Sequence, residues 1–200
     1  LESSLDSMRH NRVHRLYVMD AETAEVTGVL AYPDIVGLLY RYCRACDKGL
    51  LRARRRNGNN EYQRLKVKDV MTASVTACLE NDTLVTVIEG LTEHRCGAVL
   101  ITDAGKMALG VVSKSDLIVA YKHGMPVDVS ARTVMSRPVK SCHRDAKLSD
   151  AIQQMLLRDV QRIFVHGPDP AKIVGVLSLS DAARFRSGSC RACTSSRIMA

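Results

Sequence analysis

The heptapeptide Gly-Val-Val-Ser-Lys-Ser-Asp at residues 110–116 decides the fold, because it recurs as Gly-Val-Leu-Ser-Leu-Ser-Asp at residues 175–181. Upstream of each copy lies a second match, Val-Met-Thr at 70–72 and Val-Met-Ser at 134–136. The apolar positions between the two motifs correspond as well, since Leu84, Ile88 and Leu91 match Leu148, Ile152 and Met155. This self-similarity indicates a repeat architecture.

A third copy lies at the start of the chain. Gly-Val-Leu at 28–30 and Asp34 match Gly-Val-Leu at 175–177 and Asp181. In this register Leu1 corresponds to Leu148, so the first copy lacks a counterpart of residues 131–147. We therefore expect the chain to be a fragment, with a further repeat upstream of Leu1 in the parent protein.

Each unit predicts the same order of elements. A short strand follows the Val-Met-Thr turn, and an amphipathic helix with apolar residues at i, i+4 and i+7 comes next. Two apolar, β-rich runs, 98–102 and 108–112 in the second copy, form a hairpin, and a second helix begins near Asp116. One unit of this size is marginally stable alone, so the units are expected to pair.

The composition is that of an ordinary globular chain. Of the 200 residues, 46% are hydrophobic and 25% charged, and no apolar run approaches the roughly 20 residues that cross a bilayer. No signal peptide is visible, and the seven cysteines follow no secreted disulfide framework, so a cytoplasmic location is expected. No membrane partner is expected.

The net charge of +8 is concentrated in two segments. Residues 41–66 carry nine lysines and arginines against two acids, and residues 184–200 add four arginines. The run Arg52–Arg56 could contact nucleic acid or anionic lipid. No aromatic residue is interleaved to stack on bases, and Asn57-Gly58-Asn59-Asn60 indicates a loop. A solvated linker is the favoured interpretation, and a nucleic-acid partner is disfavoured.

The ordered recurrence of Val-Met-Thr, an amphipathic helix, a strand like Val-Gln-Arg-Ile-Phe-Val at 160–165 and Gly-h-h-Ser-x-x-Asp (h, hydrophobic) resembles the CBS domain. This resemblance implies a mixed α/β (α+β) fold of tandem repeats, each strand-helix-strand-strand-helix, paired with pseudo-twofold symmetry as in a Bateman module. The predicted organisation is a truncated first repeat at 1–40, a basic linker at 41–66, a second repeat at 67–122, a short linker at 123–130, a third repeat at 131–186 and a tail at 187–200.

The CBS resemblance implies a ligand that contains adenosine: AMP, ADP, ATP or S-adenosylmethionine. A carboxylate such as that of Asp116 or Asp181 can accept from two neighbouring ribose hydroxyls, and Ser113 and Ser178 lie three residues earlier, within reach of ribose or phosphate. The purine would lie between aliphatic side chains near Val75 and Val139. The alternative for each Ser and Asp is simple capping of a helix.

Phosphate requires cations, and three are candidates. The CBS resemblance aligns Arg162 and Arg15 with the arginine of a stretch similar to His-Arg-Leu-Pro-Val in nucleotide-binding CBS proteins. Each could instead be a solvated arginine at a strand edge. Lys114 is an additional candidate in the second repeat, which has Gly97-Ala98 at the arginine position. In the first repeat Ala31 replaces the serine before Asp34, which places that site in doubt.

Two Cys-Arg-Ala-Cys motifs follow equivalent aspartates in the first and third repeats. Four thiolates could bind zinc tetrahedrally, and the neighbouring arginines favour thiolates. The alternatives are reactive surface thiols, a redox pair, or inherited sequence without a role. The zinc candidates are Cys43, Cys46, Cys190 and Cys193.

These features favour a non-catalytic regulatory module that transmits the level of an adenosine nucleotide or S-adenosylmethionine to an attached domain or partner, with a homodimer expected. His94, Cys96, His123 and His143 supply catalytic residue types, but in no recognisable triad order, so an enzyme is not predicted. The alternative is a structural dimerisation module with empty clefts, possibly binding zinc or nucleic acid.

Overall fold

The computed structural model describes residues 2–37 and 66–184. It divides the chain into two units, which we treat separately. The first contains Leu1–Val70, Lys147–Arg162 and Ser178–Ala200, and the second contains Met71–Ala146 and Ile163–Leu177. The third repeat therefore contributes residues 147–162 and 178–184 to the first unit and the remainder, including most of its strands, to the second.

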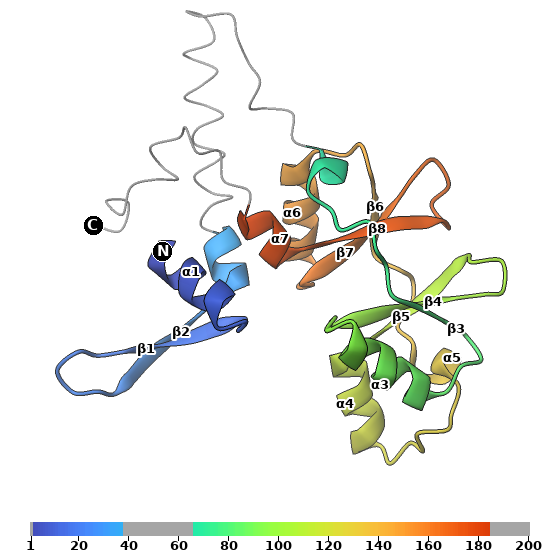
Figure 1. Cartoon of the computed structure of the whole chain (residues 1–200), viewed down its shortest axis with the longest axis horizontal. Helices are drawn as coiled ribbons and strands as arrows, with labels where there is room; N and C mark the ends of the chain where they lie inside the picture. The colour runs from blue at the N-terminus through green and yellow to red at the C-terminus, as the bar shows by residue number, and fades with distance from the viewer. Residues whose placement is uncertain (1, 38–65, 185–200) are drawn as a thin grey trace, which may run out of the picture. The chain divides into compact units, whose positions relative to one another are not determined.

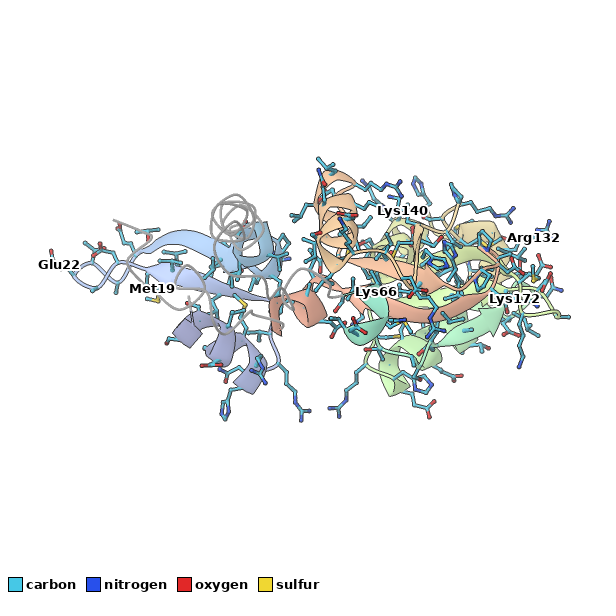
Figure 2. The ribbon with its side chains drawn as sticks, turned by 90° about the horizontal axis from the view of Figure 1, so that it is seen from above. Met19, Glu22, Lys66, Arg132, Lys140 and Lys172 are labelled. Carbon is cyan, nitrogen blue, oxygen red and sulfur yellow. The ribbon has the colours of Figure 1, made fainter. Side chains whose placement is uncertain are left out.

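In the first unit, the first repeat consists of α1 (Glu2–His10), the strands β1 (Arg15–Met19) and β2 (Val26–Ala31), and a helix at 32–37. The strands pair antiparallel, with Arg15 opposite Ala31, and Figure 2 labels Met19 and Glu22 towards the far end of this hairpin. Asp20 in the hairpin turn accepts from the Glu22 and Thr23 amides at 2.9 Å, which lowers the pKa of its carboxyl group.

The same unit contains the short 3₁₀ helix η1 (Val67–Asp69) and two helices of the third repeat, α6 (Leu148–Leu157) and α7 (Leu179–Arg184). Their buried side chains are small or aliphatic, because α6 and α7 pack closely on each other. The buried residues of α6 and α7 are Leu148, Ala151, Met155, Leu179, Ala182 and Ala183.

The second unit contains two three-stranded sheets (Figure 1). The first sheet has the order β3 (Ala77–Leu79), β4 (Ala98–Thr102), β5 (Ala108–Ser113), with β3 parallel and β5 antiparallel to the central strand. The second has the order β6 (Ser141–His143), β7 (Arg162–His166), β8 (Ile173–Ser178), with β6 parallel to β7. This common order confirms the mixed α/β fold of tandem strand-helix-strand-strand-helix repeats.

Helices α3 (Leu84–Glu93) and α4 (Lys114–Lys122) pack against the first sheet. Val87 and Leu91 of α3 and Leu117 of α4 contact one apolar cluster with the strand residues Val99, Ile101 and Val112. Every residue of β4 is buried, as expected for a central strand made of a continuous apolar run. Helix α4 begins at Lys114, two residues earlier than predicted, because Ser113 rather than a later residue is its N-cap.

The opening segment of each repeat pairs with a strand of the other repeat. Residues 71–76 open the second repeat and residues 135–140 the third. Thr72 pairs with Val176 of β8, and Ser136 pairs with Val111 of β5. A Cβ placed on Gly175 would lie 2.6 Å from the Met71 Sδ, and one placed on Gly110 would lie 2.6 Å from the Met135 Sδ. The repeated methionine and glycine therefore pack on each other across the pair, which is the pseudo-twofold arrangement that the repeats predict.

A further helix, α5 (Ala131–Val134), anchors the start of the third repeat on the second. The Ala131 amide donates to the Asp82 carbonyl at 2.7 Å, and the Arg132 guanidinium pairs with the Glu80 carboxylate at 2.7 Å. These contacts place the start of residues 135–140 beside β5, next to the first turn of α4, which contains Asp116.

Candidate functional site

Asp116, in the first turn of α4, accepts three hydrogen bonds in the second unit. The Ser113 amide and hydroxyl donate to its Oδ2 at 2.7 and 2.5 Å, and the Ser136 hydroxyl donates to its Oδ1 at 2.7 Å. The Asp116 side chain is half-buried. Because Ser136 belongs to the opening segment of the third repeat, the carboxylate lies where two repeats meet.

Part of this arrangement is the capping role considered above. The Asp116 amide donates to the Ser113 hydroxyl at 3.3 Å, so Ser113 and Asp116 form a reciprocal capping box. Asp69 and Asp82 also accept from a backbone amide three residues earlier, at 2.8 and 2.7 Å. Asp116 differs from these two because its second oxygen is bound by another repeat.

Ser136 was not among the candidate site residues, although the sequence contained a signal for it. It ends the Val-Met-Ser match, so the motif places a hydroxyl at equivalent positions, 72 and 136, in two repeats. Its contact with Asp116 joins residues 20 positions apart. A hydroxyl that already donates to this carboxylate occupies the place where a ribose hydroxyl could donate instead.

The equivalent pair of the third repeat, Ser178 and Asp181, lies in the first unit. The Ser178 amide and hydroxyl donate to the Asp181 Oδ2 at 3.1 and 2.5 Å, and the Ser178 and Ser180 hydroxyl oxygens are 2.7 Å apart. Both Ser178 and Asp181 are half-buried. The serine and aspartate of this motif are therefore arranged as they are in the second repeat.

The first repeat lacks the hydroxyl, as its sequence indicates. Asp34 is exposed and accepts from the Ala31 amide at 2.8 Å. Arg15 is exposed at the start of β1. Asp34 therefore keeps the hydrogen bond from the amide three residues earlier. Ala31, which stands where the other repeats have serine, contributes only this backbone donor.

The remaining candidates lie on the opening segments, on strand β7 and on helix α4. Val75 and Val139 are half-buried. The residue that follows each of them accepts a hydrogen bond from a central strand: the Leu100 amide donates to the Thr76 carbonyl, and the Phe164 amide to the Lys140 carbonyl, both at 3.0 Å. Arg162 is half-buried at the start of β7, and Lys114 is exposed at the start of α4. The structure brings Ser113, Asp116 and Ser136 together and records no direct bond from the two valines to that cluster.

The profile of the CBS domain family matches residues 67–123 and 131–188, more than half of the chain. The chain belongs to the CBS domain family. A curated relative, an uncharacterized protein of Methanopyrus kandleri, is 28% identical over 116 residues, which cover 57% of this chain and 56% of the relative. The chain spans about half the length of the two curated relatives it matches, 56% of one and 43% of the other.

Solved structures share this CBS fold. A protein of Methanocaldococcus jannaschii superposes with a TM-score of 0.72 at 14% identity, covering 92% of this chain and 63% of that one. The CBS domain protein of Pyrobaculum aerophilum complexed with AMP gives 0.56 at 20% identity, covering 68% and 100%. The CBS domain pair of another Methanocaldococcus jannaschii protein, in complex with 5′-methylthioadenosine and S-adenosyl-L-methionine, gives 0.56 at 19%, covering 60% and 94%.

The proposed zinc ligands, Cys43, Cys46, Cys190 and Cys193, lie outside the described residues. Within residues 2–37 and 66–184 no group of three or more His, Cys, Asp or Glu side chains is arranged to hold a metal ion. His143 packs edge-on against His166, with ring centroids 5.6 Å apart, and its Nδ1 accepts from the Asp145 amide at 3.1 Å. Among the described helices none is long and apolar enough to cross a membrane.

Two thiols of the CBS pair are held in the protonated form. Burial raises the pKa of Cys142, in β6, from 9.0 to about 11. Burial is also the main cause of the raised pKa of Cys78, with smaller contributions from the charges of Asp82 and Cys96. Since the thiolate is the nucleophile, neither group is an activated one.

This shift predicts slow alkylation of Cys142. At pH 8 the thiolate fraction of a thiol with a pKa of about 11 is on the order of 100-fold lower than that of an ordinary cysteine. Peptide mapping after iodoacetamide treatment should therefore show Cys142 reacting at least about 100-fold more slowly in the folded chain than in urea, with a rate that rises with pH. Equal rates in the two conditions would contradict the burial of this side chain.

Proposed function

We propose that this chain is a regulatory CBS module that binds AMP, ADP, ATP or S-adenosylmethionine and transmits the level of that ligand to an attached domain or partner. The observation that carries the proposal is the half-buried Asp116 carboxylate between Ser113 and Ser136. A ribose that replaces the Ser136 hydroxyl would donate its own hydroxyl to Oδ1 with little rearrangement of the carboxylate. The AMP complex of the Pyrobaculum aerophilum relative supports this choice of ligand class.

Signal transmission follows from the position of Ser136. Its backbone pairs with Val111, and the preceding Met135 covers Gly110. A ligand that takes the place of the Ser136 hydroxyl acts on both repeats at once, and it favours whichever packing of the pair it binds more tightly. We assign a purine contact to each of Val75 and Val139, a separate phosphate contact to each of Lys114 and Arg162, and a second ribose contact to Ser178 and Asp181.

The proposal extends to assembly, location and chemistry. We infer a homodimer. We infer a cytoplasmic location because the seven cysteines follow no secreted disulfide framework. We also infer a non-catalytic role, because His94, Cys96, His123 and His143 stand in no recognisable triad order in the sequence. The second candidate, a structural dimerisation module with empty clefts, is favoured by one observation: both Asp116 oxygens already have donors within the protein.

Thermal unfolding of the whole chain with a ligand panel separates the two candidates. A ligand at about 100 times its dissociation constant adds about 2.7 kcal/mol to the free energy of unfolding, so the melting temperature should rise with at least one of the four adenosine compounds. The 2′-deoxy form of that compound should stabilise less, because it lacks one of the two hydroxyls. A flat response to all four compounds would contradict the nucleotide-binding proposal and favour the structural alternative.

A further inference from the structure

The closing motifs of the second and third repeats differ at one carboxylate oxygen. The Oδ2 of Asp116 and the Oδ2 of Asp181 each accept from the amide and the hydroxyl of the serine three residues earlier. The Oδ1 of Asp116 also accepts from the Ser136 hydroxyl, at 2.7 Å. Within residues 2–37 and 66–184, no group donates a hydrogen bond to the Oδ1 of Asp181. The same local motif therefore presents an occupied acceptor in the second repeat and an acceptor with no donor from these residues in the third.

The hydroxyl is the movable part of the contact between Ser136 and Asp116. The Ser136 backbone is fixed, because its amide donates to the Val111 carbonyl at 2.8 Å and its carbonyl accepts from the Val111 amide at 3.1 Å. The Ser136 side chain is exposed, so a rotation about χ1 can carry the hydroxyl from the carboxylate into water. A ribose hydroxyl can therefore take its place without any change in the strand pairing.

Thr72 is the equivalent of Ser136 at the start of the second repeat, and its backbone is held in the same way. Its amide and its carbonyl both pair with Val176, each at 2.9 Å. The Thr72 side chain is exposed, and its hydroxyl makes no hydrogen bond to any residue that the structure describes. Occupation of an aspartate oxygen by a protein hydroxyl is therefore particular to Ser136 and does not follow from the pairing of the repeats.

A second difference concerns the first residue of the central strand. Arg162 begins β7 and Ala98 begins β4. Each follows a residue whose carbonyl accepts from the first amide of the closing helix, at 2.9 Å in the third repeat and 3.2 Å in the second. An arginine at this position can pair with phosphate, whereas the buried Ala98 cannot. The third repeat therefore combines a guanidinium with a carboxylate oxygen from which ribose displaces no described donor.

We propose that the two adenosine sites are filled in order, Asp181 before Asp116, and that Ser136 is an internal competitor that lowers the affinity of the Asp116 site. This inference rests on the proposed function and adds its regulation. The Asp116 site can bind ribose only in the fraction of molecules in which Ser136 has left the carboxylate, so its apparent affinity falls by that fraction. Binding there also breaks a hydrogen bond between the second and third repeats. The second binding event therefore responds to high ligand levels and is the one that removes a contact of the pair.

Titration calorimetry of the full 200-residue chain with AMP, ADP, ATP and S-adenosylmethionine tests the order of filling. At least one compound should bind in two events of unequal affinity. Ser136→Ala should tighten the weaker event by about three- to tenfold and leave the tighter one unchanged, because a hydrogen bond to a charged acceptor corresponds to a factor of about ten or more and the displaced serine recovers part of it from water. If the weaker event is too weak to detect in the unmodified chain, it should become measurable in Ser136→Ala.

Substitutions at the two carboxylates assign the events. Asp181→Asn should remove the tighter event, and Asp116→Asn the weaker one, because an amide oxygen is a poorer acceptor than a carboxylate. Thr72→Val is the matched control for Ser136→Ala, since it deletes the equivalent hydroxyl, which has no partner among the described residues. It should leave both affinities unchanged.

Three results would overturn the inference: two events of equal affinity in the unmodified chain, a tighter event that is lost in Asp116→Asn, or a Ser136→Ala chain that binds no more tightly at the weaker site. A purely structural role for Ser136 gives the last of these, since deleting a structural contact does not improve binding. Failure of the proposed function is distinguishable, because in that case none of the four compounds gives a heat of binding with any variant.

Discussion

Replacing Gly110 with alanine is expected to lower the free energy of unfolding by about 1–3 kcal/mol, the usual result of overpacking a filled site. The new Cβ would lie 2.6 Å from the Met135 Sδ and 3.0 Å from the Ser136 carbonyl oxygen. The methionine can rotate, but the carbonyl cannot move without breaking the pairing of Ser136 with Val111. The loss should appear as a lower midpoint in urea denaturation followed by circular dichroism.

The internal repeats supply matched partners for this experiment. Gly175→Ala should have a similar effect, because its Cβ would lie 2.6 Å from the Met71 Sδ and 3.0 Å from the Thr72 carbonyl oxygen. Gly28 stands at the same position of the first repeat, where a Cβ would meet no atom within 4 Å. Gly28→Ala should be neutral or stabilising by up to about 1 kcal/mol, through the entropy of the unfolded chain. If all three variants were equally stable, the close contact of opening segments with β5 and β8 would be wrong.

Replacing Asp116 with alanine is expected to weaken binding of the stabilising adenosine compound by about 10- to 100-fold. This range corresponds to about 1.4–2.8 kcal/mol, close to the contribution of a single hydrogen bond to a charged acceptor, about 1.5–3 kcal/mol. The same change removes the acceptor of the Ser113 and Ser136 hydroxyls, so the stability of the ligand-free chain should also fall by about 1 kcal/mol. Titration calorimetry measures the first effect, and urea denaturation the second.

A control variant is needed because a destabilised chain can bind poorly for trivial reasons. Asp82→Ala removes a comparable contact, the acceptor of the Leu79 amide at 2.7 Å, in the same unit. It should cost similar stability and leave nucleotide affinity unchanged. If Asp82→Ala and Asp116→Ala lost affinity equally, the ribose role of Asp116 would be refuted, and its contribution would be capping alone.

Much of the fold could be predicted because its signals are local. The order strand-helix-strand-strand-helix follows from apolar periodicity within short windows, and the recurrence of Gly-h-h-Ser-x-x-Asp fixed where each repeat should end. The predicted link between Ser113 and Asp116 is equally local, since residues three apart meet in the first turn of a helix. Even the predicted start of α4 was wrong by only two residues, because the cap rather than the acid begins the helix.

The contact between Ser136 and Asp116 could not be predicted from local patterns. The Ser136 hydroxyl reaches Asp116 only because the opening segment of one repeat crosses to β5 of the other, a contact that spans 20 residues of sequence. The sequence showed a hydroxyl at the end of Val-Met-Ser but contained no local reason for it to lie beside a particular carboxylate. Such a contact depends on how two sheets pair, which short-range periodicity does not encode.

The amino-acid sequence by itself determined the order of elements within a repeat and the serine-aspartate pairs of the second and third repeats, because these depend on neighbours within a few residues. Only the tertiary structure decided which equivalent positions are covered. Ile118 and Ala183 occupy the same place in their repeats, yet one is 68% and the other 2% exposed. The reason is that burial depends on what lies across the helix, and identical local patterns can have different partners.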